Sequence, residues 1–113
     1  MRLPANPQEL AEVILQRSTC SVQVGAVLAD GHGIYAWGWN STGPDGYGLH
    51  AEIHCLLRAN RRRLGNSTLY VAGRRQRTGN NVLARPCAAC RPYLTDIGRV
   101  CYRDKSGRWV DDI

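Results

Sequence analysis

The sequence contains no long hydrophobic run. None of its uninterrupted apolar stretches approaches the ~20 residues that a transmembrane helix requires, so no membrane partner is expected. The opening residues Met-Arg-Leu-Pro-Ala-Asn-Pro also lack the apolar core of a secretory signal peptide. These two absences predict a cytoplasmic protein.

Internal repeats, low-complexity tracts and linker-like segments are absent as well. The 113 residues are enough for one hydrophobic core and too few for two. The apolar fraction of 43% and the charged fraction of 21% are those of an ordinary globular protein. We therefore predict a single domain over residues 1–113.

Lysine is almost absent, and arginine supplies 14 of the 15 basic residues. The net charge of +6 is therefore carried by guanidinium groups, which bind phosphate through a planar fork and stack on bases. This favours a nucleotide or a single-stranded nucleic acid as partner. A solvated basic helix face remains the alternative explanation of a charge run. The arginines between residues 58 and 85 are Arg58, Arg61, Arg62, Arg63, Arg74, Arg75, Arg77 and Arg85.

The number of cysteines is odd, which speaks against a complete disulfide framework. Cys87 and Cys90 form a C-x-x-C pair, which by itself suits either a metal or a redox dithiol. We expect the remaining cysteines to be small buried residues of the core. They are Cys20, Cys55 and Cys101.

A His-Ala-Glu triplet that ends at Glu52 favours a metal site over a redox dithiol for the cysteine pair. His50, Cys87 and Cys90 are three good zinc ligands, one short of a closed tetrahedron. A structural zinc site fills all four positions with protein atoms, whereas a catalytic site keeps one position for water. Glu52 lies two residues from His50, close enough to move protons for that water. We predict one zinc ion per chain, with water as the fourth ligand and Glu52 as the catalytic residue.

His54 and Cys55 are the nearby residues that could complete the tetrahedron instead. A fourth protein ligand would close the site and make the zinc purely structural. We expect His54 to face solvent or a carbonyl group, which leaves the site open.

Hydrophobic periodicity and turn residues predict the element order α-β-β-α-β-α-β-β, with helices packed on a mixed sheet. The turn at 104–107 is too short for a crossover, so the last two strands are expected to be antiparallel. The second and third helices would carry the zinc ligands at their N-terminal ends, where the helix dipole favours thiolates. The expected helices are 6–17, 50–62 and 87–97, and the expected strands are 22–29, 34–39, 68–72, 99–103 and 108–112.

Further segments carry a family pattern: V-G-A-V-L at 24–28, G-W-N at 38–40, H-A-E-I at 50–53, T-L-Y-V at 68–71 and I-G-R-V at 97–100. Together with the spaced pair H-x-E and P-C-x-x-C, they resemble the cytidine deaminase superfamily over nearly the whole chain. The resemblance implies a three-layer α/β fold, in which a five-stranded mixed sheet has helices on both faces and its last two strands are antiparallel.

The resemblance also implies hydrolytic chemistry, in which hydroxide formed from the zinc water attacks the ring carbon that carries the amino group. Glu52 would take the water proton, protonate the ring nitrogen and help ammonia leave. Asn40 would hydrogen-bond the sugar or base, and the Ala51 backbone amide would face the base carbonyl or ring nitrogen. Cytosine would become uracil, or adenine hypoxanthine.

Three departures from the family pattern bear on the substrate. His50 replaces the cysteine that free-cytidine deaminases commonly use, which argues against simple nucleoside salvage. The segment 73–85 is longer than in tRNA adenosine deaminases, and Arg85 stands where they often have Glu or Ser, so we expect Arg85 to contact substrate. The short C-terminal hairpin resembles the compact layout of free-cytidine deaminases and of some bacterial toxin or phage-type deaminases.

Aromatic and basic residues near the motif are the remaining candidates for substrate contact. Tyr47, in the glycine-rich loop before the His-Ala-Glu triplet, is the best candidate to stack on a base. Alternation along a strand places Tyr35, Trp37 and Trp39 on one face, where core packing is at least as good an explanation. In the segment before the cysteine pair, we predict phosphate contacts for Arg74, Arg75 and Arg77.

The first functional hypothesis is a zinc-dependent hydrolase that converts cytosine to uracil in single-stranded DNA or another polynucleotide. The alternative is a free-nucleotide deaminase of the deoxycytidylate kind, which needs one or two of the arginines for a single phosphate. Adenosine in RNA as substrate, and a zinc-stabilised nucleic-acid binding module without catalysis, are further alternatives. Relatives with this compact layout often form dimers or tetramers, so the resemblance also allows a homo-oligomer.

Overall fold

A computed structural model describes residues 6–42 and 48–112 of the chain. Within these ranges, no helix has both the length and the apolar character of a membrane-spanning segment. The helices are α1 (Pro7–Ile14), η1 (Leu15–Arg17), α2 (Ala51–Arg58), η2 (Arg61–Asn66) and η3 (Arg91–Leu94). The strands are β1 (Val22–Asp30), β2 (Gly33–Trp39), β3 (Ser41–Thr42), β4 (Gly48–Leu49), β5 (Thr68–Arg75), β6 (Asn81–Val82), β7 (Arg99–Arg103) and β8 (Trp109–Asp111).

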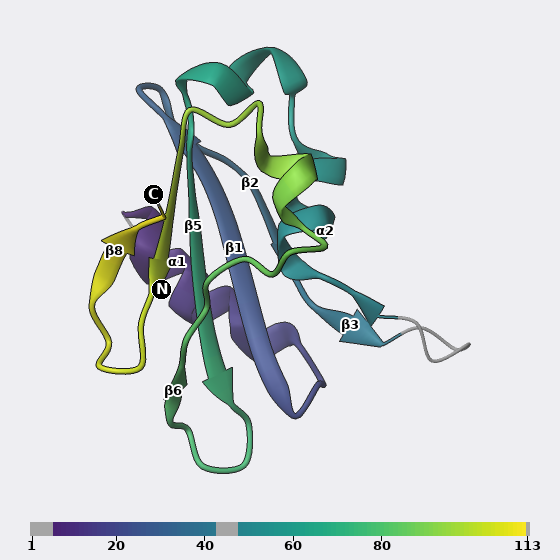
Figure 1. Ribbon diagram of the computed structural model, residues 1–113, viewed down its shortest axis with the longest axis vertical. Coiled ribbons are helices and arrows are strands. Elements are labelled where there is room, and N and C mark those ends of the chain that lie inside the picture. Colours follow the sequence, from purple (N-terminus) through teal and green to yellow (C-terminus); the bar gives the residue numbers. More distant parts are fainter. Residues whose placement is uncertain (1–5, 43–47, 113) are drawn as a thin grey trace, which may run out of the picture.

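The main sheet is mixed, as predicted, with strand order β2-β1-β5-β7-β8. β1 pairs antiparallel with β2 and with β5, whereas β5 pairs parallel with β7. β5 and β7 can run parallel because the connection between them is long. This connection crosses the front of the sheet and reaches α2 before β7 begins (Figure 1). β7 and β8 are antiparallel, as the short turn between them predicted. The two-residue β6 pairs with the end of β5 and extends the sheet there.

Helices cover both faces of this sheet, which confirms the predicted three-layer fold. Successive residues of β1 point to opposite faces, so Ala26 and Leu28 belong to one core cluster and Val27 to the other. The larger cluster lies between the sheet and α2, where Cys55 and Leu56 are buried. The smaller cluster lies under α1, which Figure 1 shows behind the sheet. Burial on both sides explains why β1 is apolar along most of its length.

The predicted helix over 87–97 is wrong. The chain makes a turn at 88–90 and then only the 3₁₀ helix η3, so the cysteine pair lies on no α-helix. Pro92 gives the physical reason, because proline has no N–H and its ring clashes with the carbonyl four residues back in an α-helix. The expected stabilisation of thiolates by an α-helix dipole therefore does not apply to Cys87 and Cys90.

The helix that follows the His-Ala-Glu triplet is shorter than predicted, ending at Arg58 rather than near residue 62. Ala59 leaves the helical region with an extended backbone at ψ 147°. The Asn60 side chain then accepts a hydrogen bond of 3.1 Å from the Arg62 N–H and begins η2. A local capping interaction therefore outweighs the continuing helical pattern of the sequence.

The aromatic residues of β2 do not all share one face, contrary to the prediction. A register shift between Leu28 and Ala29 places one extra residue on β2, which moves Tyr35 toward the α2 core. There the Tyr35 hydroxyl lies 2.7 Å from the Ser67 hydroxyl. Trp39 instead packs against the α1 cluster, with the Arg17 guanidinium 5.2 Å from the centre of its ring.

Gly38 determines how closely α2 approaches β2. A Cβ atom at this position would lie 2.5 Å from the Cys55 backbone nitrogen and 3.0 Å from the Ala51 carbonyl oxygen. Both are backbone atoms of α2, so the clash could be relieved only by moving the whole helix. We expect Gly38→Ala to lower the free energy of unfolding by about 1–3 kcal/mol, measured by urea denaturation.

Gly31→Ala is the matched control, because a Cβ atom there would meet nothing within 4 Å. This variant is expected to have nearly the stability of the unchanged protein. Equal stability of the two alanine variants would show that α2 is not held by its contact with Gly38.

Candidate active site

Three zinc-ligand side chains from distant parts of the sequence meet at one end of α2. His50 is the N-cap residue of α2, and Cys87 and Cys90 lie in the turn before η3. The His50 Nδ1 atom lies 3.0 Å from the Cys90 Sγ atom and 3.6 Å from the Cys87 Sγ atom. All three donor atoms lie within 4.8 Å of one another.

This donor set fits zinc. Zinc–nitrogen and zinc–sulfur bonds of ordinary length, meeting at the tetrahedral angle, place N and S roughly 3.5 Å apart. The two N···S distances of 3.0 and 3.6 Å are close to that value. Imidazole and thiolate are also the donors that zinc prefers over carboxylate and carbonyl oxygen. His50, Cys87 and Cys90 can therefore hold one zinc ion per chain.

Neither neighbouring candidate completes the tetrahedron. The His54 Nδ1 atom lies 3.2 Å from the Trp39 backbone nitrogen and 3.1 Å from its carbonyl oxygen, so the ring faces β2. Cys55 is fully buried in the α2 core, and burial raises the pKa of its thiol to about 12. Within residues 6–42 and 48–112, the group of potential metal donors consists of His50, Cys87 and Cys90. Neither His54 nor Cys55 therefore joins this group of three donors.

The turn between the cysteines is closed by backbone hydrogen bonds. The Cys87 carbonyl oxygen accepts from the Cys90 N–H at 3.1 Å and from the Arg91 N–H at 3.2 Å. Cys90 is only 2% exposed, and burial raises the pKa of its thiol to about 12. Cys90 is therefore protonated in the metal-free chain at neutral pH, and metal binding must displace its proton.

Glu52 lies in the first turn of α2, beside this donor group, and is only 5% exposed. Burial raises the pKa of its carboxyl above the usual range, although its own backbone N–H and the neighbouring His50 partly oppose the shift. A buried carboxyl group with a raised pKa, next to a metal-binding group, is typical of residues that carry protons during catalysis.

A recess of about 200 Å³ opens beside the metal-binding group. The predicted substrate contacts Asn40, Ala51 and Arg85 line it together with His50 and Glu52. Tyr47, the predicted stacking residue, lies outside the residues that the structure describes. Sequence reasoning missed the apolar wall of the recess, because these residues come from the start of β1, from β6 and from the connection after β6. They are Val22, Val24, Val82, Leu83 and Ala84.

Asn40 has a structural role that the sequence did not reveal. Its side-chain oxygen accepts from the Val24 N–H, and its side-chain nitrogen donates to the Val22 carbonyl oxygen, both at 2.8 Å. These bonds fix the orientation of the amide group at the edge of the recess. An amide can form four hydrogen bonds, so one further donor and one further acceptor site remain for a substrate.

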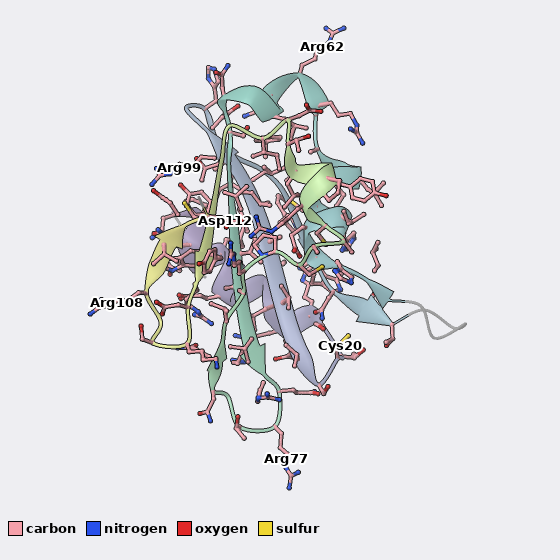
Figure 2. The ribbon with its side chains drawn as sticks, viewed as in Figure 1. Cys20, Arg62, Arg77, Arg99, Arg108 and Asp112 are labelled. Carbon is pink, nitrogen blue, oxygen red and sulfur yellow. The ribbon has the colours of Figure 1, made fainter. Side chains whose placement is uncertain are left out.

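The arginines predicted to contact substrate or phosphate lie at different distances from the recess. Arg85 lines it, with its side chain half exposed. Arg74 is half-buried in β5 and donates a 3.0 Å hydrogen bond to the Gln23 side chain. Arg75 and Arg77 are exposed, and Figure 2 shows Arg77 pointing outward beyond the end of the sheet.

Comparison with known proteins agrees with this geometry. Residues 7–103 match the family model described as the cytidine and deoxycytidylate deaminase zinc-binding region. The fold is similar to that of a cytidine deaminase from Burkholderia pseudomallei, at 21% identity and a TM-score of 0.74, covering 94% of this chain and 88% of that chain. A dCMP deaminase from the cyanophage S-TIM5 is similar at 24% identity and a TM-score of 0.65, covering 87% of this chain and 79% of that one. No curated protein sequence matches the chain.

The family model spans most of the chain, including the His-Ala-Glu triplet and both cysteines of the metal-binding turn. The two solved structures named above, whose fold the chain shares, are a deaminase of cytidine and a deaminase of dCMP. The chain therefore belongs to the family of zinc-binding cytidine and deoxycytidylate deaminases.

Proposed function

We propose that the protein hydrolytically deaminates the cytosine base of a phosphorylated substrate. The first candidate substrate is a free deoxycytidine nucleotide. The observation that carries this proposal is the buried Glu52 carboxyl beside a three-donor metal group, at a recess lined by Glu52, His50 and Cys87. The recess is small and mainly apolar, which suits a single base.

The residues of the site have distinct tasks in this reaction. Zinc, when bound by His50, Cys87 and Cys90, supplies a water molecule that is activated at neutral pH. Glu52 would transfer one proton of the attacking water to the ring nitrogen N3, and a second proton, from the new C4 hydroxyl group, to the leaving amine. The C4–N bond breaks and a C4–O bond forms, so cytosine and water give uracil and ammonia. The Ala51 N–H and the Asn40 amide hold the base and sugar.

Arg85 is the best-placed residue to bind the substrate phosphate. Its Nε atom lies 3.3 Å from an Asp112 carboxylate oxygen, which uses one of the five N–H donors of the guanidinium. The other donors suit the planar, two-point binding of a phosphate group. The dCMP deaminase of cyanophage S-TIM5, whose complex with dCMP and dUMP has a TM-score of 0.62 to this fold, supports a free nucleotide as the first candidate.

A single-stranded polynucleotide is the second candidate substrate. The exposed Arg75 and Arg77 lie on the β5–β6 hairpin, and the chain after this hairpin forms part of the apolar wall of the recess. A strand that leaves the recess along the hairpin would place further phosphates near these arginines. Such a contact would make activity fall steeply with salt concentration.

Turnover of dCMP, cytidine and labelled single-stranded oligonucleotides by the zinc-loaded protein distinguishes these candidates. We expect dCMP to be the best substrate, and Arg85→Gln to raise its KM by roughly 10–100-fold, as loss of a charge-assisted contact predicts. Arg77→Gln is the matched control and should leave dCMP kinetics unchanged. Preference for oligonucleotides, with strong effects of Arg75→Gln and Arg77→Gln, would support the second candidate. Inosine formation from an adenosine-containing RNA, or no turnover of any substrate, would contradict both.

A further inference from the structure

Asp112 connects the C-terminal hairpin to the metal-binding turn. Its Oδ1 atom accepts a hydrogen bond from Arg91 Nη2 at 3.1 Å and one from Arg85 Nε at 3.3 Å. The side chain is only 9% exposed, although both arginine side chains reach solvent. The Asp112 backbone N–H donates to the Val100 carbonyl oxygen at 2.8 Å, so the residue is anchored on β7.

The two arginines stand on either side of the zinc ligands in the chain. Arg85 comes just before the Pro86–Cys87 segment, and Arg91 directly follows Cys90. A single carboxylate oxygen therefore joins both ends of the metal-binding turn to the sheet. Figure 2 labels Asp112 among the side chains near the centre of the view.

We propose that Asp112 is a positioning residue, which holds the Cys87–Cys90 turn in its metal-binding geometry and orients Arg85 at the recess. This inference rests on the proposed zinc site but does not depend on which substrate is used. It concerns a residue that lies outside the His-Ala-Glu and Cys-x-x-Cys motifs.

The turn needs such support because it has little regular structure of its own. Residues 83–90 form neither helix nor strand, so few backbone hydrogen bonds restrain them. One of these joins the Ala84 N–H to the Arg103 carbonyl oxygen at 3.1 Å. Zinc binding requires two sulfur atoms and one nitrogen within tenths of an ångström of the right positions. Small displacements of the turn would therefore weaken the site.

The charges beside the metal-binding turn give a second reason why the turn needs Asp112. Arg85 and Arg91 share one carboxylate oxygen, so without Asp112 two positive charges would lie close together beside a site for a divalent cation. Their repulsion would push the two ends of the turn apart, and their field would oppose zinc binding. Asp112 cancels one of these charges and ties both side chains down.

Asp111 provides a matched control in the neighbouring position. It is also an aspartate paired with an arginine, since its Oδ1 atom accepts from Arg99 Nη2 at 2.6 Å and from the Cys101 thiol at 3.1 Å. Its side chain is 48% exposed and contacts neither Arg85 nor Arg91 in these hydrogen bonds. A general weakening of the C-terminal hairpin would follow from changing either aspartate, whereas an effect through the metal-binding turn would follow from changing Asp112 alone.

The test is the zinc affinity of the purified full chain, measured by competition with a chromophoric chelator in the absence of substrate. We expect Asp112→Asn to weaken zinc binding by roughly 10–100-fold, the usual effect of losing a residue that supports metal ligands. Asp111→Asn should change it less than about twofold, and both variants should keep the circular dichroism of the unchanged protein. The thiolate absorption bands of the Co²⁺-substituted protein should shift in Asp112→Asn only, because they report the geometry of the metal ligands.

A double-mutant cycle with Arg91→Gln makes the assignment specific. If Asp112 acts through Arg91, the two substitutions together should weaken zinc binding by much less than the product of their separate effects. Equal zinc affinities of the Asp111→Asn and Asp112→Asn proteins would overturn the proposal. Tight zinc binding by the unchanged protein without any turnover would instead contradict the proposed function and leave the role of Asp112 intact.

Discussion

Replacing Glu52 with glutamine is expected to lower kcat by about 10³-fold or more, while the protein keeps its zinc and its fold. The buried carboxyl group is the proposed proton carrier of the site, and general acid–base groups contribute typically about 10²–10⁴-fold to a rate. Glu52 would act in more than one proton transfer, so the effect should lie toward the upper end. Glutamine has nearly the same shape, so the loss would reflect the missing proton transfer. Steady-state deamination of dCMP measures the loss of kcat, and the zinc content of the same preparation shows whether the metal is retained.

The thermal stability of this variant is a second readout. Burial makes a charged carboxyl unfavourable at position 52, as the raised pKa of Glu52 indicates. Glu52→Gln should therefore have an equal or higher Tm. Glu9→Gln is the matched control, because Glu9 occupies the first turn of the equally long α1 but is exposed. A Glu52→Gln enzyme with unchanged kcat would show that another group carries the proton.

Replacing Cys87 with alanine is expected to remove zinc from the protein and, with it, all measurable deamination. Only His50 and Cys90 would remain as ligands, too few to hold zinc against a chelator. Cys87 is exposed, so the substitution leaves no cavity in the core and the loss can be attributed to the metal. We expect the zinc content to fall from about one ion per chain to near zero after dialysis against a chelator.

Cys20→Ala controls for the removal of a thiol, because Cys20 is partly exposed and lies outside the metal-binding group. It should retain zinc and activity. Zinc should also raise the Tm of the unchanged protein and of Cys20→Ala, since a ligand that binds only the folded state stabilises it. Full zinc content in Cys87→Ala would mean that the ligand set is wrong.

Much of the site was predictable because zinc chemistry depends on the type of donor atom. Imidazole, thiolate and a nearby carboxyl group can be recognised in the sequence whatever brings them together. The hairpin of β1 and β2 and the antiparallel β7–β8 pair were predictable for a similar local reason. Short turns between apolar strands leave only one way to pair them.

The errors arose where tertiary contacts or a single residue outweighed a local pattern. The segment 87–97 has helical periodicity, but Pro92 breaks it and only η3 forms. Tyr35 should share a face with Trp37 by simple alternation, but one extra residue at the register shift turns it to the other side. Neither effect can be read from the spacing of apolar residues.

Residue types and their spacing along the chain were enough to predict the zinc chemistry of this protein: three zinc donors, a carboxyl group two residues from one of them, and the strands of a mixed sheet. Tertiary structure alone decided how that chemistry is supported. The bonds of Asn40 to β1, the close approach of α2 at Gly38 and the two arginines on Asp112 all join residues far apart in the chain. Such contacts depend on the packing of whole strands and helices, which the residue types of a short motif do not specify.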